Sequence, residues 1–254
     1  MTNEEKRAIA IHEAGHASVS WLLEHANPLV KVTIVPRGQS LGAAWYLPEE
    51  RTITTKEQML DEICATLAGR AAEEVFLGRI SSGALNDLER VTQRAYGMVA
   101  YLGMSESLPN LSYYSNQESF QKPYSEETGR RIDAEVSRLI NEQYERAKRI
   151  LTENAAKHNA LADLLCEHEV IFAADVTNIF GPRPWKSRAE IIMEEQPPVH
   201  HETPADASLT SAEAMTPTAD SATETAKSVV ESGNTPETSE NSSSHPVDAP
   251  FSPN

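Results

Sequence analysis

The chain has 254 residues and a formal net charge of −16 at pH 7, and this acidic balance without a basic patch argues against nucleic-acid binding. Its two cysteines, Cys64 and Cys166, lie far apart with no CxxC pairing, so neither a disulfide framework nor a cysteine zinc site is indicated. The sequence shows no signal peptide and no apolar run near the roughly 20 residues of a membrane span, so we expect this chain to be soluble and cytoplasmic.

Composition divides the chain into two unequal parts. Residues 1–186 show regular apolar periodicity and predict one domain with its own hydrophobic core. Residues 187–254 predict a disordered acidic tail, because from about Pro197 onward Ser, Thr, Glu, Ala and Pro dominate and Lys227 is the single basic residue.

The domain begins with an amphipathic helix at residues 2–23. Thr2 and Glu5 match the capping-box pattern at its start. Residues 30–35 alternate between apolar and polar side chains, and residues 41–47 form a second apolar segment, so the two predict a small sheet packed on the helices. An exposed edge of this sheet would hold an extended peptide through main-chain hydrogen bonds.

The rest of the domain is predicted to be helical. The expected helices cover residues 54–77, 84–101, 125–154, 159–167 and 173–180, with an irregular stretch at 103–124 and the end of the fold at 181–184. The predicted fold class is therefore mainly α, a helical domain with a small β-sheet element.

The first predicted helix contains His12-Glu13-Ala14-Gly15-His16. Residues i and i+4 share one helical face, so His12 and His16 can bind one zinc ion. Zinc lowers the pKa of a bound water to about 7, and Glu13 lies near enough to accept its proton as general base. A buried helix with two structural histidines is the alternative interpretation.

A catalytic zinc site needs a third protein ligand, and the local sequence does not supply one. Two later segments offer carboxylates, Glu73 and Glu74 late in one predicted helix and Asp87 and Glu89 at the start of the next. Spacing alone does not choose between them, because an acidic residue at a helix start more often stabilises the helix dipole.

Several collinear motifs carry a resemblance to a known family. They are His12-Glu13-Ala14-Gly15-His16, Val32-Thr33-Ile34-Val35-Pro36-Arg37-Gly38, Leu47-Pro48-Glu49, Gly69-Arg70-Ala71-Ala72-Glu73-Glu74 and Ser82-Gly83-Ala84-Leu85-Asn86-Asp87-Leu88-Glu89-Arg90. Together they resemble the peptidase domain of the FtsH family of ATP-dependent membrane zinc metalloproteases, from about Glu4 to Trp185. The family usually has Gly at the position of Ala68 and Thr at the position of Ser82.

The resemblance implies specific roles for five residues. His12, His16 and Asp87 would bind one Zn²⁺ per chain, Glu13 would be the catalytic base, and Glu73 would orient a ligand histidine. It also implies polypeptide substrates, assembly into a homohexamer and, for the full-length family, an anchor in the inner membrane that faces the cytoplasm.

The chain lacks one part of the family pattern, the GxxxxGK[ST] phosphate loop of the AAA ATPase module. We therefore expect that this chain does not bind ATP and that it is the C-terminal piece of a longer protein. The predicted function is a zinc metalloendopeptidase, the proteolytic part of an FtsH-type protease that acts on unfolded or membrane-extracted proteins. The alternatives are a non-catalytic scaffold subunit of a protease ring and a free-standing peptidase that works without ATP.

Overall fold

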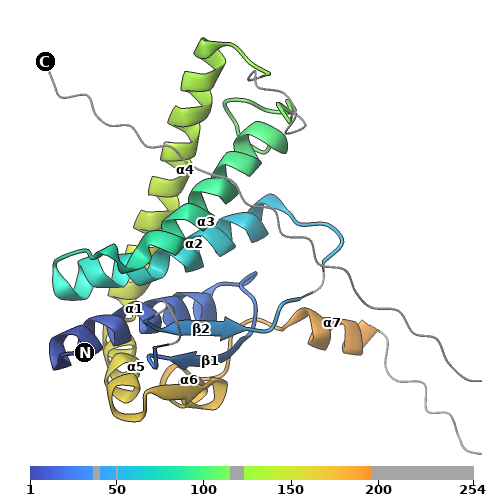
Figure 1. Ribbon diagram of the computed structural model, residues 1–254. Coiled ribbons are helices and arrows are strands. Elements are labelled where there is room, and N and C mark those ends of the chain that lie inside the picture. The colour runs from blue at the N-terminus through green and yellow to red at the C-terminus, as the bar shows by residue number, and fades with distance from the viewer. Residues whose placement is uncertain (37–40, 50, 115–122, 196–254) are drawn as a thin grey trace, which may run out of the picture. The chain divides into compact units, whose positions relative to one another are not determined.

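The computed structural model describes residues 1–36, 41–49, 51–114 and 123–195 (Figure 1). It confirms a mainly α fold with a small sheet. The helices are α1 (Asn3–Leu22), α2 (Lys56–Ala72), α3 (Leu85–Tyr96), α4 (Glu126–Glu153), α5 (Ala155–His168), α6 (Ala173–Phe180) and α7 (Arg188–Glu195). The strands are β1 (Leu29–Thr33), β2 (Ala43–Tyr46) and β3 (Val170–Phe172). Three short helical turns complete the list, the π-helices η1 (Glu73–Leu77) and η3 (Gly97–Tyr101) and the 3₁₀-helix η2 (Ser82–Ala84).

Helix α1 is the central element of the domain. It begins with the predicted capping box, in which Thr2 Oγ1 accepts a hydrogen bond from Glu5 N at 3.2 Å and the Glu5 carboxylate accepts one from Thr2 N at 2.6 Å. Every residue from Ala10 to Trp21 is buried, because α2 and α5 both pack against this helix. Polar groups on the inner part of α1 therefore lie inside the protein and need partners there.

Helices α1 and α2 approach each other closely at Gly15. A Cβ atom at this position would lie 2.5 Å from the carbonyl oxygen of Ala68 and 2.7 Å from Cβ of Ala72. Glycine in mid-helix costs about 1 kcal/mol relative to alanine, and here the missing side chain is what allows the contact. This close approach brings the histidine face of α1 against α2.

The sheet has the strand order β2-β1-β3, with both neighbours antiparallel to β1. The β1–β2 pair agrees with the sequence prediction, whereas β3 was not predicted. One face of the sheet packs on the helices and buries Leu29, Val32 and Ile171. The other face exposes Trp45 of β2, and β2 forms one edge of the sheet.

Several boundaries differ from the sequence prediction. The helix expected at 54–77 is α2 followed by the π-helical turn η1, and it ends at Gly78 in the left-handed conformation with φ of 65°. The helix expected at 84–101 consists of α3 and η3. The fold was expected to end at residues 181–184, but α7 follows at Arg188–Glu195, and none of its residues is buried.

Some predicted features lie outside the described residues. They are residues 37–38 of the family-like motif, residues 115–122 of the irregular stretch and residues 196–254 of the tail. The domain boundary at residue 186 therefore stays a prediction. Among the described residues, no helix is both long enough and apolar enough to cross a membrane.

Candidate metal centre

Three side chains from α1 and α3 lie close together. His12 and His16 come from adjacent turns of α1, and Asp87 comes from the first turn of α3. His12 Nε2 lies 3.1 Å from His16 Nε2, and Asp87 Oδ2 lies 3.3 Å and 3.4 Å from the two nitrogens. Within the described parts of the chain, these residues form the one group of three or more His, Cys, Asp or Glu side chains that could hold a metal ion.

The triangle of these three atoms has the dimensions of a zinc site. Zinc–ligand bonds of about 2.0–2.1 Å in a tetrahedron place neighbouring ligand atoms about 3.3 Å apart. The observed edges of 3.1–3.4 Å match this value. Two imidazoles and a carboxylate that leave a fourth position open are also the donor set of catalytic zinc. The residues present therefore fit zinc.

Hydrogen bonds at the far side of each ring direct the Nε2 atoms into this triangle. His12 Nδ1 donates to Glu73 Oε1 at 2.7 Å, and His16 Nδ1 donates to the main-chain oxygen of Ala65 at 2.9 Å. A proton held on Nδ1 leaves the lone pair of Nε2 for a metal ion. Glu73 is itself fixed, because its carboxylate accepts hydrogen bonds from the Ser81 main-chain nitrogen at 2.7 Å and from Ser81 Oγ at 3.0 Å.

Gly69 lets α2 pass directly over the two histidines. A Cβ atom at Gly69 would lie 2.5 Å from His16 Nε2 and closer still to His12 Nε2. Real Cβ atoms essentially never approach another atom below 3.0 Å, so any side chain at residue 69 would disturb both rings. The absence of a side chain here leaves the histidine nitrogens accessible to a bound ion.

Glu13 lies near both the metal-site triangle and the residue that precedes β2. Its side chain is packed so closely against Gly42 that a Cβ atom there would lie 2.6 Å from Glu13 Oε1. Glu13 is buried, and this burial raises the pKa of its carboxyl, while the neighbouring His16 and His12 oppose the increase. A carboxyl group with a raised pKa is a better proton acceptor for general-base chemistry.

In the absence of a metal ion, the positive charge of His12 and the negative charge of Asp87 stabilise each other. Burial disfavours a charged His12, but hydrogen bonds with Asp87 and Glu73 outweigh burial and raise the pKa of His12 to about 9. Burial also acts on Asp87, yet its contacts with His12 and His16 hold the pKa of this carboxyl below its usual range. A metal ion that binds here must displace a proton from His12, so binding releases protons.

The structure shows which of the candidate carboxylates lie at the histidines and which do not. Asp87 lies in the triangle and Glu73 contacts the outer nitrogen of His12. Glu74 faces α4 instead, and Glu89 accepts a hydrogen bond from Gln93 on its own helix.

Sequence reasoning missed the part played by Gly69. Its position within a helix was the available signal, since a glycine there often marks a close approach.

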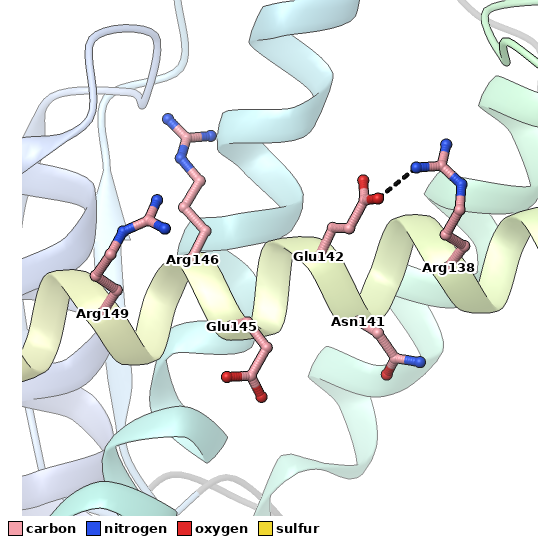
Figure 2. A pocket seen from close by; sticks show the side chains of 6 residues that line it. All are labelled: Arg138, Asn141, Glu142, Glu145, Arg146 and Arg149. Carbon is pink, nitrogen blue, oxygen red and sulfur yellow. Dashed lines mark hydrogen bonds and ion pairs between the residues drawn. The ribbon is translucent and has the colours of Figure 1, made fainter.

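A concave region lies on α4 and is lined by Arg138, Asn141, Glu142, Glu145, Arg146 and Arg149. Figure 2 shows these side chains along one helix, with Arg138 paired to Glu142. The region contains none of the predicted site residues, and Arg146 and Glu145 form ion pairs with Asp61 and Lys148, which do not line it. We assign no binding site to it.

Comparison with known proteins decides the family. The sequence profile of peptidase family M41 matches residues 1–179. The chain belongs to peptidase family M41. This match confirms the predicted resemblance to a peptidase domain.

The chain is similar to proteins that are named as proteases or protease components. The chain is 65% identical over 198 residues to the ATP-dependent zinc metalloprotease FtsH of Parabacteroides distasonis, which covers 77% of this chain and 29% of the relative. It is 54% identical over 188 residues to the protein of the same name from Rhodothermus marinus, covering 72% of this chain and 27% of the relative. It is 48% identical over 189 residues to the mouse mitochondrial inner membrane m-AAA protease component AFG3L2, covering 73% of this chain and 24% of the relative. The chain thus spans less than a third of the length of these relatives.

Proposed function

We propose that this chain is the proteolytic part of an ATP-dependent FtsH-type protease and hydrolyses peptide bonds in unfolded or membrane-extracted proteins. One Zn²⁺ per chain would be held by His12, His16 and Asp87. The observation that carries the proposal is the triangle of Nε2, Nε2 and Oδ2 atoms with edges of 3.1–3.4 Å beside the buried carboxyl of Glu13.

The residues around the triangle have distinct tasks in this reaction. When bound, zinc supplies Lewis-acid polarisation of the scissile carbonyl and a lowered pKa for the attacking water. Glu13 accepts the proton of the attacking water and passes a proton to the leaving amine. Glu73 keeps the proton of His12 on Nδ1, which preserves the ligand nitrogen.

The edge strand β2 offers a place for the substrate chain. Strand β2 follows directly after Gly42, the residue packed on the Glu13 side chain. An extended peptide paired antiparallel or parallel with this edge would lie next to the proton acceptor, held by main-chain hydrogen bonds that do not depend on sequence. This arrangement supports a broad preference for unfolded polypeptides.

Further features of the proposed protease are suggested by the names of the relatives. The relatives' names include ATP dependence and, for the mouse protein, the mitochondrial inner membrane. We propose that this chain receives substrate from an AAA ATPase module in the same full-length protein and does not bind ATP itself. We also propose that it assembles as a homohexamer and that the full-length protein is membrane-anchored.

Substitution Glu13→Gln tests the proposed reaction. We expect it to abolish hydrolysis of casein, an unfolded protein that needs no ATP-driven unfolding, while zinc content stays at one ion per chain. Glu24→Gln is the matched control, because Glu24 is exposed and lies two residues beyond the end of α1. Retained hydrolysis in Glu13→Gln would refute the role of Glu13.

The same measurements separate the alternatives. A wild-type chain that binds zinc and leaves casein intact would indicate a scaffold subunit. A chain that cleaves short peptides and folded proteins equally well without an ATPase module would indicate a free-standing peptidase.

A further inference from the structure

The end of α2 widens into the π-helical turn η1, and side chains of this turn reach three neighbouring elements. Glu73 contacts His12 on α1, Glu74 contacts α4, and the ring of Phe76 stacks on His158 of α5 with centroids 4.2 Å apart. Such π-turns are rare in proteins and occur frequently at functional sites. In this protein, contacts with α1, α4 and α5 surround the turn.

Glu74 is bound by two side chains of α4. Tyr144 Oη donates a hydrogen bond to Glu74 Oε2 at 2.5 Å, and Lys148 Nζ donates to Glu74 Oε1 at 2.8 Å. The ammonium group of Lys148 also lies 5.6 Å from the centre of the Tyr144 ring, within the range of a cation–π contact. We call these three residues, Glu74, Tyr144 and Lys148, the Glu74 clamp.

The electrostatics of the Glu74 clamp favour this arrangement at neutral pH. Hydrogen bonds from Lys148 and Tyr144 lower the pKa of Glu74, so its carboxyl is ionised and accepts both bonds. Burial and the bond to Glu74 raise the pKa of the Tyr144 hydroxyl, so it stays protonated and can donate. Lys148 is also a charged donor, and charge-assisted bonds of this kind are stronger than neutral ones.

We propose that Tyr144 and Lys148 are positioning residues for the metal centre, which they serve by holding η1 through Glu74 so that Glu73 stays bonded to His12. This inference rests on the proposed function, because it requires His12 to be a metal ligand. Glu73 and Glu74 are consecutive, so a backbone shift that frees one carboxylate moves the other. A return of η1 to α-helical hydrogen bonding would rotate the following side chains by roughly 100°, since one residue fewer would fit each turn.

The competing explanation is that the Glu74 clamp only stabilises the fold. A matched pair in the same structure separates the two explanations. Arg146 of α4, labelled in Figure 2, forms an ion pair of 2.8 Å with Asp61 near the other end of α2. Asp61 is buried and also accepts a hydrogen bond from His25 N, but it does not belong to η1. Both bridges join α4 to the same continuous helix, and only the Glu74 clamp adjoins Glu73.

The experiment measures zinc affinity by competition with a chromophoric chelator, on the whole chain, for Tyr144→Phe, Lys148→Met and the double variant. We expect each single substitution to weaken zinc binding several-fold and the double substitution to weaken it about tenfold, the lower end of the range for groups that orient metal ligands. Arg146→Met is expected to lower the denaturant midpoint of the zinc-free chain and to leave zinc affinity unchanged.

A thermodynamic cycle with Glu73→Gln tests whether the effect passes through Glu73. Because the clamp acts on His12 through Glu73, we expect Tyr144→Phe to cause no further loss of zinc affinity in the Glu73→Gln background. Wild-type zinc affinity in the clamp variants, or an equal loss in Arg146→Met, would overturn the inference. Failure of the wild-type chain to bind zinc would instead overturn the proposed function, so the two failures are distinguishable.

Discussion

Substitution of Gly69 by alanine tests the geometry of the metal centre with the addition of one methyl group. The new Cβ atom would lie 2.5 Å from His16 Nε2, whereas ordinary contacts begin at 3.4 Å. The new methyl group would therefore lie about 0.9 Å too close to His16 Nε2, while zinc–ligand distances vary by only about 0.2 Å. Either α1 and α2 must separate or both imidazoles must swing away from Glu73 and Ala65.

The structure resists separation of the helices, because α1 and α2 are already in close contact where Gly15 meets Ala68. We therefore expect the histidine rings to move and zinc affinity to fall at least 100-fold, which corresponds to about 2.8 kcal/mol. Helix formation itself should not suffer, since alanine is favoured over glycine by about 1 kcal/mol within a helix. A normal helical circular-dichroism spectrum with weak zinc binding is the expected combination.

Gly97→Ala is the matched control for the change at Gly69. Gly97 also lies in a helical segment, and a Cβ atom there would meet nothing nearer than Tyr101 Cδ2 at 4.0 Å. Zinc affinity is measured by chelator competition and zinc content by elemental analysis. Wild-type zinc affinity in Gly69→Ala would refute the reasoning, because the histidine nitrogens could not then lie under residue 69.

Three further predictions address other contacts. Asp87→Asn removes the charge of the proposed third ligand and should lower zinc affinity at least about 100-fold, and unchanged affinity in the same competition assay would exclude Asp87 as a ligand. Gly15→Ala places a methyl group 2.5 Å from the Ala68 oxygen and should lower the free energy of unfolding by about 1–3 kcal/mol in urea, whereas an increase would contradict the close helix contact. Burial lowers the pKa of His158 from 6.5 to about 4. Between these pH values the unfolded chain binds more protons than the folded one, so the free energy of unfolding falls by up to about 3 kcal/mol as pH decreases from 6.5 to 4. His158→Phe keeps a ring to stack on Phe76 and should remove this part of the pH dependence, while an identical pH profile would show that His158 does not cause it.

Local patterns in the sequence predicted the helix that carries the site. The i, i+4 spacing placed His12 and His16 on one face, and the Thr2–Glu5 capping box identified the helix start, which the structure confirms. These features depend on neighbours within a few residues. The packing of α1 against α2 could be anticipated only in part, from the presence of Gly15 within a helix.

Features that depend on tertiary structure could not be derived from local patterns. The spacing of the sequence left Glu73, Asp87 and other carboxylates open, and family resemblance rather than geometry selected Asp87. Strand β3 has only three residues and pairs with a strand far away in the sequence, so no alternation was long enough to reveal it. The π-turn η1 is likewise invisible in the sequence, because its wider turn is held by contacts from α1, α4 and α5.

The metal centre can be observed directly in a crystal of the whole chain grown with zinc, from anomalous diffraction recorded on both sides of the zinc absorption edge. The anomalous difference map should contain one peak per chain, bounded by His12 Nε2, His16 Nε2 and Asp87 Oδ2, with the Glu13 carboxylate nearby and not among the ligands. A map without a peak at this triangle, or a zinc ion bound by Glu73 in place of Asp87, would contradict the assignment.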